Sequence, residues 1–254
     1  MKTGCYLLMI CSVLVLSASC SKDKSDESGG GTIRINFVNL AGTDTLHLGS
    51  TYHNSFGEDL SLQKFKYYIS NIRFTEYPSG QIINAPETYH LVDQADPSTY
   101  SFLLQMPITG LTGISFLLGV DSTRNVSGAQ TGDLDPTRDM FWTWNSGYIT
   151  AKIEGNSTFS SEADQALTLH IGGFRTGENV TRNISLPFPG GSNVSMEAGK
   201  TTEIYINADV LTWFSGVHDL KIADHPTCTT PGILATSYAD NYARMFILAS
   251  AYTP

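Results

Sequence analysis

Short runs of alternating apolar and polar residues recur along the chain, separated by Gly, Pro, Asn and Asp. Successive side chains of a β-strand point to opposite faces of a sheet, so this pattern predicts strands with one buried face. It occurs at residues 33–40, 45–49, 62–74, 89–92, 101–106, 114–120, 148–155, 166–174, 180–188, 200–208 and 243–252. Only residues 208–214 and parts of 217–242 favour helical turns. We therefore expect an all-β fold, a β-sandwich or open barrel of about ten short antiparallel strands with little helix.

The N-terminal residues have the pattern of a secretory signal. Lys2 supplies the positive end, residues 6–16 form an apolar run too short to span a membrane, and residues 17–19 are small. Cys20 follows directly, which suits a lipoprotein whose lipidated cysteine becomes the first residue. Ser17 stands where the usual lipoprotein motif has leucine, so ordinary secretion is the alternative.

These features predict the organisation of the chain. We expect a lipoprotein-type signal peptide at 1–19, a flexible Ser/Gly-containing tether at 20–31 and one β domain at 32–254. The protein would then be held in the cell envelope by lipid alone, at the outer membrane or in the periplasm. The formal net charge of −9 argues against a nucleic-acid partner, which would require a basic surface.

The cysteines exclude a disulfide framework. Cys5 and Cys11 would leave with the signal and Cys20 would carry lipid, which leaves Cys228 alone. His225 lies three residues before Cys228, with His218 close by, and this spacing suits a metal. A single such pair is a weak signal, so we favour a loop with a buried free thiol.

Strand alternation places His170 away from the main apolar face of its segment. Leu167, Leu169 and Ile171 share one face, and His170 points to the other. There it faces water, which we favour on ordinary exposure of histidine, or a polar site.

Residues 140–148 read MFWTWNSGY and place Trp142 and Trp144 two positions apart. If the segment is extended, the two indoles share a face, and they are either two core residues under a loop or part of a functional site. The loop before them carries Asp133, Asp135 and Asp139, but it lacks the further acidic ligands and final glutamate of an EF-hand. We favour a solvated loop there.

The chain contains no nucleophile elbow, phosphate-binding glycine loop or zinc-protease helix. We therefore expect a protein that is not an enzyme.

Six segments, in order along nearly the whole domain, carry a resemblance to a known family. They are FKYYISNIRF (65–74), YHLVD (89–93), FLLGVDSTRN (116–125), MFWTWNSGY (140–148), LTLHIGG (167–173) and NYARMF (241–246). In these segments the chain resembles the MbnP-like family, bacterial periplasmic or surface proteins named for a copper protein that accompanies the copper chelator methanobactin.

The resemblance implies a β-rich fold that binds one copper ion. It also implies that a partner di-haem enzyme of the MbnH type, related to cytochrome c peroxidases, oxidises a tryptophan to kynurenine. An intact indole has no in-plane lone pair, whereas ring opening frees an aromatic amine that can coordinate a metal.

On this resemblance, His170 is the first candidate for an imidazole ligand and His90 is the second, because reduced copper favours imidazole and soft sulfur. Met140 is a candidate thioether ligand. Trp144 is preferred slightly over Trp142 as the oxidised residue, because it adjoins the Asn-Ser-Gly turn. A ligand set that uses His225 is the alternative.

A different functional class is also compatible with the sequence. The twelve tyrosines, the tether and the acidic surface fit an adhesion or glycan-binding lipoprotein that holds no metal and stacks sugars on exposed aromatic rings.

Overall fold

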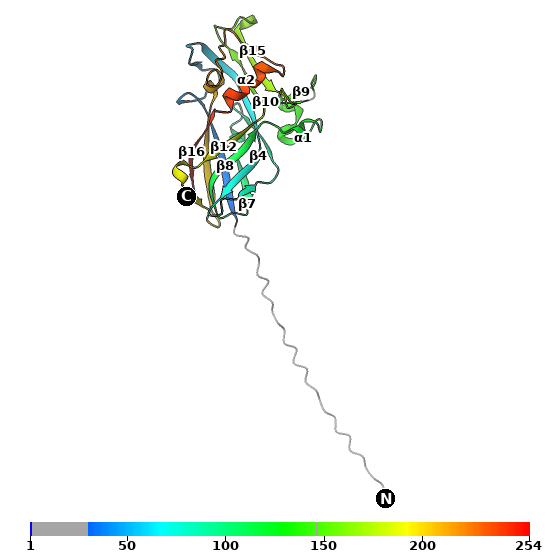
Figure 1. Cartoon of the computed structure of the whole chain (residues 1–254), viewed down its shortest axis with the longest axis vertical. Helices are drawn as coiled ribbons and strands as arrows, with labels where there is room; N and C mark the ends of the chain where they lie inside the picture. The colour runs from blue at the N-terminus through cyan, green and yellow to red at the C-terminus, as the bar shows by residue number, and fades with distance from the viewer. Residues whose placement is uncertain (2–29, 146) are drawn as a thin grey trace.

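The computed structural model of the protein describes Met1, residues 30–145 and residues 147–254 (Figure 1). Residues 2–19 of the predicted signal peptide, Cys20 and the tether up to residue 29 lie outside the described residues. Strands are the main regular secondary structure of the described residues, as the alternating pattern predicts. In the same residues, no helix is long and apolar enough to cross a membrane.

The smaller sheet is built around β1 (Gly31–Ala41). β1 pairs in parallel with β14 (Thr201–Asp209) and antiparallel with β7 (Ser101–Met106) and β2 (Asp44–Thr45), and β16 (Phe246–Tyr252) is antiparallel to β14. The expectation of purely antiparallel strands was therefore wrong. Apolar alternation reveals which face of a strand is buried, but it does not reveal the direction of a neighbour that lies far away in the sequence.

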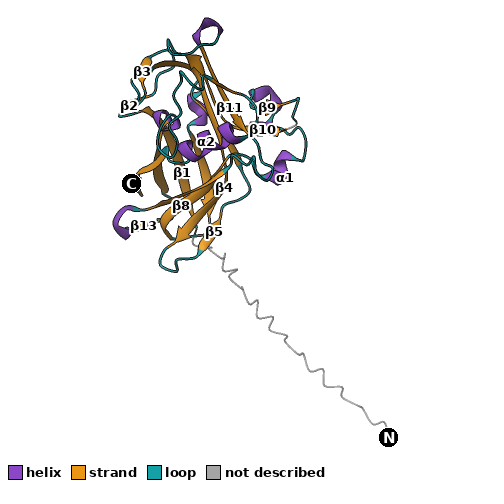
Figure 2. Cartoon of the chain, turned by 45° about the horizontal axis from the view of Figure 1, so that its top comes forward, coloured by secondary structure: helices purple, strands orange, loops and turns teal. Residues whose placement is uncertain are grey.

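The larger sheet is built around β4 (Asp59–Glu76), and it curls into a half-barrel (Figure 2). The strand order is β12 (Arg182–Pro187), β8 (Gly110–Leu118), β4, β10 (Gly147–Asn156), β11 (Ala166–Gly172) and β15 (Thr227–Cys228). β13 (Val194–Ser195) pairs with β8, β9 (Phe141–Trp142) pairs with β10, and β3 (Thr51–His53), β5 (Ile82–Asn84) and β6 (Tyr89–Asp93) follow the other edge of β4. β15 runs parallel to β11.

The helices are short. They are α1 (Ser122–Asn125), α2 (Ile233–Tyr242) and 3-10 turns at Pro97–Thr99, Gly132–Leu134, Pro136–Arg138, Ala163–Gln165, Pro189–Gly191 and Val210–Trp213. The last turn and α2 fall in the two regions that were expected to contain helical turns.

The predicted strand at 45–49 ends after Thr45. The next residues form a turn in which the backbone N–H of His47 donates to the hydroxyl of Tyr52 at 2.8 Å, so this donor is satisfied without a strand partner. β3, β5, β9, β13 and β15 contain two or three residues each, too few for alternation to reveal them.

The main core lies between the two sheets and is rich in aromatic rings. The rings of Phe37, Phe116 and Phe246 meet edge to face, with centroids 5.2 Å apart for Phe116 and Phe246 and 6.1 Å apart for Phe37 and Phe116. Tyr67 is fully buried beside them, and its hydroxyl donates to the side-chain oxygen of Asn39 at 2.8 Å. These contacts tie β1, β4, β8 and β16 together.

A second, smaller apolar cluster lies on the outer face of the larger sheet. Tyr68 follows Tyr67 in β4 and points to this opposite face. The cluster contains Tyr68, Leu91, Val120, Leu134, Met140, Trp142, Tyr148 and Ile149. Residues 121–145, here termed the covering segment, lie over it, and the hydroxyl of Tyr68 donates to the backbone oxygen of Asp133 at 2.8 Å.

We expect Phe116→Ala to lower the free energy of unfolding by about 3–5 kcal/mol, because it removes a fully buried ring from the aromatic core. Leu103→Ala is the matched control, since Leu103 is 53% exposed and its loss should cost about 0.5 kcal/mol or less. Urea unfolding of both variants checks this, and equal losses would contradict the assignment of the core.

Candidate functional site

A row of basic side chains crosses the outer face of the larger sheet beneath the covering segment. Lys152 of β10 pairs with His170 of β11 on one side and with Lys66 of β4 on the other. Directly paired residues point to the same face of a sheet. Glu154, two residues after Lys152, pairs with Lys64 and shares this face.

Lys152 is the most deeply buried charge of this row, with its side chain 1% exposed. Its ammonium donates to the backbone oxygen of Asp139 and lies 3.0 Å from the Asp139 carboxylate. Lys64 lies 2.8 Å from the same carboxylate and 3.0 Å from Glu154. A buried ammonium requires such partners, so these contacts hold the end of the covering segment against the sheet.

His170 faces this polar network rather than bulk water, which corrects the favoured expectation. Its Nε2 lies 2.9 Å from Oε1 of Glu154, and its side chain is 20% exposed. Burial, followed by the charge of Lys152, lowers the pKa of His170 although Glu154 opposes the shift. Burial raises the pKa of Glu154, but hydrogen bonds from Lys64 and His170 outweigh it and the pKa lies below its usual value.

The imidazole of His170 is therefore neutral at neutral pH. With Glu154 ionised, Nε2–H is the donor, and this assigns the lone pair of the ring to Nδ1. Among the described residues, Nδ1 of His170 has no hydrogen-bond partner. A carboxylate that holds one ring nitrogen while the other stays free is the arrangement common to metal-binding histidines.

The tryptophan pair contacts β11 two residues beyond His170. Gly172 follows His170 by two positions on the same face, about 7 Å along the strand. The ring of Trp142 covers Gly172 so closely that a Cβ atom there would lie 2.7 and 2.8 Å from two indole carbons. The rings of Trp142 and Trp144 have centroids 5.3 Å apart and are inclined by 39°.

The two indoles differ sharply in exposure. Trp142 is 6% exposed and belongs to the outer cluster, whereas Trp144 is 62% exposed. β9 ends at Trp142 and a turn follows, so only one of the two rings is a core residue. Met140 is fully buried in the same cluster.

His90 lies on the opposite face of the larger sheet from His170. It pairs with Ile69, which points into the main core, whereas its neighbour Leu91 pairs with Tyr68 on the outer face. Its ring stacks on Phe102, with centroids 3.4 Å apart and planes 6° apart. The structure thus brings His170, Trp142, Trp144 and Met140 into one region and excludes His90 from it.

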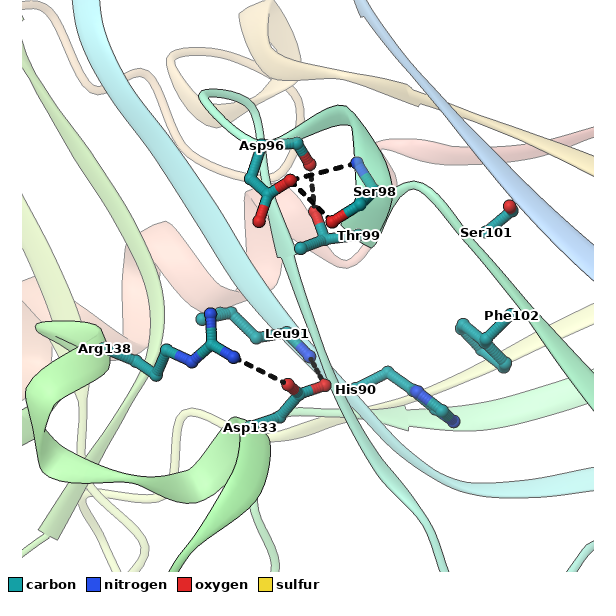
Figure 3. Close-up of a pocket in the computed structure, with 9 residues that line it drawn as sticks. All are labelled: His90, Leu91, Asp96, Ser98, Thr99, Ser101, Phe102, Asp133 and Arg138. Atoms are coloured by element: carbon teal, nitrogen blue, oxygen red, sulfur yellow. Dashed lines mark hydrogen bonds and ion pairs between the residues drawn. The ribbon is translucent and has the colours of Figure 1, made fainter.

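His90 lines a separate pocket of about 260 Å³ with Phe102, Asp133 and Arg138 (Figure 3). Figure 3 shows its ring directed toward Phe102 and away from Asp133. Nε2 of His90 is buried without a hydrogen-bond partner in the described part of the chain. Burial lowers the pKa of His90 to about 4.

The three carboxylates of the acidic loop, those of Asp133, Asp135 and Asp139, each have a separate partner. Asp133 accepts from the backbone N–H of Leu91 at 3.1 Å, Asp135 caps the turn at Thr137, and Asp139 binds the lysines. The loop is more than a solvated connection, because two of its three carboxylates dock it on the sheet.

The alternative histidine and cysteine set is dispersed. His218 lies 3.2 Å from Asp240, and Cys228 is a buried free thiol whose pKa burial raises to about 11, as the favoured interpretation predicts. Within residues 30–145 and 147–254, no three His, Cys, Asp or Glu side chains form a group that would hold a metal.

Sequence reasoning identified His170 but missed its network of Lys64, Lys152, Glu154 and Asp139. The signal was present in residues 152–154, where a lysine and a glutamate alternate with an isoleucine inside an otherwise buried strand. The distant Asp139 had no such signal.

Comparisons with known proteins agree with this fold. A family model described as MbnP matches residues 30–230. The structure is similar to that of MbnP from Methylosinus trichosporium, with a TM-score of 0.53 and 12% sequence identity, covering 75% of this chain and 80% of that chain. At this identity the match shows a shared fold alone. The search of curated protein sequences gave no match.

We expect acid to destabilise the protein partly through His90. Its folded pKa of about 4 lies below the usual histidine pKa of 6.5, so between these two pH values the unfolded chain binds more protons and stability falls as the pH falls. The full effect is about 3 kcal/mol. His90→Phe, which keeps an aromatic ring on Phe102, should lose less stability than the wild type between about pH 7 and about pH 4.5 in urea unfolding. His47→Phe, at an exposed position, is the control. Identical losses in the wild type and His90→Phe would refute this assignment.

Proposed function

This chain belongs to the MbnP family, and from that premise we propose that it is a non-catalytic copper-binding protein of the bacterial cell envelope. In this proposal His170 and a kynurenine formed from Trp144 or Trp142 hold the copper. A lipid on Cys20 anchors the protein. The observation that carries the proposal is that Trp142, paired with Trp144, covers Gly172, two residues along β11 from a neutral imidazole whose Nε2 is held by Glu154.

The residues of this site fit a metal only after tryptophan oxidation. His170 offers one lone pair, and Glu154 is 2.9 Å away but is shared with Lys64. Neither indole offers a lone pair while its ring is intact. An aromatic amine from an opened ring would add the nitrogen donor that the described side chains do not provide.

The exposure of Trp144 supports it as the oxidised residue. A partner enzyme that acts from solvent reaches a ring that is 62% exposed more readily than Trp142, which is 6% exposed. The oxidant is dioxygen or two molecules of peroxide, activated by the partner enzyme. It breaks the bond between the two carbons of the five-membered ring that are not shared with the benzene ring, and each of these carbons gains one oxygen atom. Hydrolysis then releases the formyl carbon as formate and frees the amine. The proposed oxidant-delivering partner is a di-haem enzyme of the MbnH type.

The chain's own residues have defined roles in this site. Glu154 orients His170 and keeps its Nδ1 unprotonated, and Lys152 disfavours the imidazolium by its charge. Met140 is a soft sulfur close in sequence to the indoles, and its complete burial means that it would need to turn before it reached a metal. Copper in its reduced state would favour such imidazole and sulfur donors.

Coexpression with a di-haem oxidase of the MbnH type should convert one of the two tryptophans. We expect the peptide that contains Trp142 and Trp144 to gain two oxygens and lose the elements of carbon monoxide, and tandem mass spectrometry should place the change at Trp144. Trp144→Phe should abolish it, whereas Trp213→Phe, at a ring in the main core, should leave it in place. An unchanged peptide, with no copper retained on dialysis, would remove the proposal.

Copper retention should depend on His170. We expect His170→Ala to lower copper affinity by about tenfold or more, and Glu154→Gln to lower it less, because the amide still holds the ring but no longer fixes its tautomer. Competition with a chelator of known affinity measures this on the oxidised protein. His47→Ala is the matched control on an exposed histidine, and His90→Ala tests the second candidate ligand. Loss of copper in His90→Ala but not in His170→Ala would contradict the site.

A further inference from the structure

A polar pocket of about 350 Å³ lies along the second half of β4 and plays no part in the proposed copper site. Its polar lining comes from Asn71, Arg73, Asn84, Glu87 and Asn183. Figure 2 shows β5, which carries Asn84, at the end of the sheet remote from β9 and β10. The pocket and the tryptophan pair therefore occupy separate regions of one sheet.

Arg73 is the unusual residue of this pocket. Its Nε is buried and has no hydrogen-bond partner among the described residues. In the described chain Arg124 and Arg182 lie 2.7 and 2.6 Å from a carboxylate, but no such ion pair involves Arg73. A buried guanidinium N–H without an acceptor is costly, so a residue of this kind requires an explanation.

The carboxylate of the lining, that of Glu87, is already paired with another residue. Glu87 accepts from two nitrogens of Arg124, at 2.7 and 3.1 Å, so its charge is compensated without Arg73. Asn71 donates to Asp121 at 3.2 Å, outside the lining. Arg73 thus lines the pocket beside neutral amides and one neutralised carboxylate.

The sheet holds Arg73 in place. Its backbone pairs with Asn84 of β5 on one edge of β4 and with Ser115 of β8 on the other. The adjacent Ile72 and Phe74 are buried in the main core, which turns Arg73 outward. A cation supported in this way by strands on both sides is preorganised for a ligand.

We propose that this pocket binds a small oxyanion, a carboxylate or phosphate group, through the guanidinium of Arg73. The planar guanidinium donates to two oxygens of such a group at once. The amides of Asn84 and Asn183 are exposed on the same rim and donate or accept hydrogen bonds, so they suit the hydroxyls of a sugar or polyol that carries the oxyanion. The two terminal nitrogens of Arg73 are the donors for this contact, because Nε is closed to solvent and they are not.

The test is an NMR titration of the guanidinium N–H signals of the copper-free protein. Inorganic phosphate, acetate and glucuronate are added in separate arms, with chloride and glucose as controls at matched ionic strength. We expect a saturable shift of the Arg73 signal in at least one oxyanion arm, and the arm that binds most tightly identifies the source as phosphate or carboxylate. The shift should vanish in Arg73→Gln and persist in Arg175→Gln, which removes the same charge from an exposed position.

Thermal unfolding separates binding from a structural role. Without oxyanion, Arg73→Gln should unfold at the wild-type temperature or above it, because the variant no longer holds a buried Nε–H without an acceptor. The rise in midpoint that the oxyanion causes in the wild type should be lost. The proposal is overturned if no oxyanion moves the Arg73 signal up to about 100 mM, a concentration at which even very weak specific binding is visible. It is also overturned if Arg73→Gln binds as well as the wild type.

Discussion

The buried ammonium of Lys152 is the interaction on which the candidate site depends. It rises from β10 on the outer face of the sheet, where only 1% of its side chain remains exposed. The backbone oxygen and carboxylate of Asp139 cover it, and this fixes the end of the covering segment. Met140 follows Asp139 directly and Trp142 lies two residues further on, so the same contact helps to place the indole over Gly172, two residues along β11 from His170. Without this ion pair, the segment would keep the apolar cluster and the hydrogen bonds of Asp133 to Tyr68 and Leu91, but its link to the buried lysine would be lost.

The sequence predicted much of the fold but little of its pairing. The long strands β1, β4, β7, β10 and β14 were predicted because alternation over six or more residues is unambiguous. The parallel pairing of β1 with β14 was not, because strand direction depends on contacts between residues about 170 positions apart. The family was also predicted, and the match over residues 30–230 confirms it.

The sequence predicted only part of the candidate site, again because alternation in one strand does not reveal its neighbours. Alternation placed His170 off the apolar face, but it could not show that Lys152 and Glu154 occupy that face beside it. His90 was a reasonable candidate by type, yet its register with Ile69 directs it into the other side of the sheet. Trp142 and Trp144 were predicted to share a face if their segment is extended, but β9 ends at Trp142 and a turn follows, which leaves one ring buried and the other exposed. These outcomes depend on register and on a turn, which a single sequence does not encode locally.

β4 carries residues of both the candidate copper site and the proposed oxyanion pocket. Its first half carries Lys64 and Lys66 beneath the covering segment, and its second half carries Arg73 beside β5.

The position of the proposed copper site is tested most directly by anomalous diffraction at the copper edge from crystals of the oxidised, copper-loaded protein. The account predicts one peak on the outer face of the sheet, between His170 and the tryptophan pair. A peak beside His90 and Phe102, or beside Cys228, would contradict it.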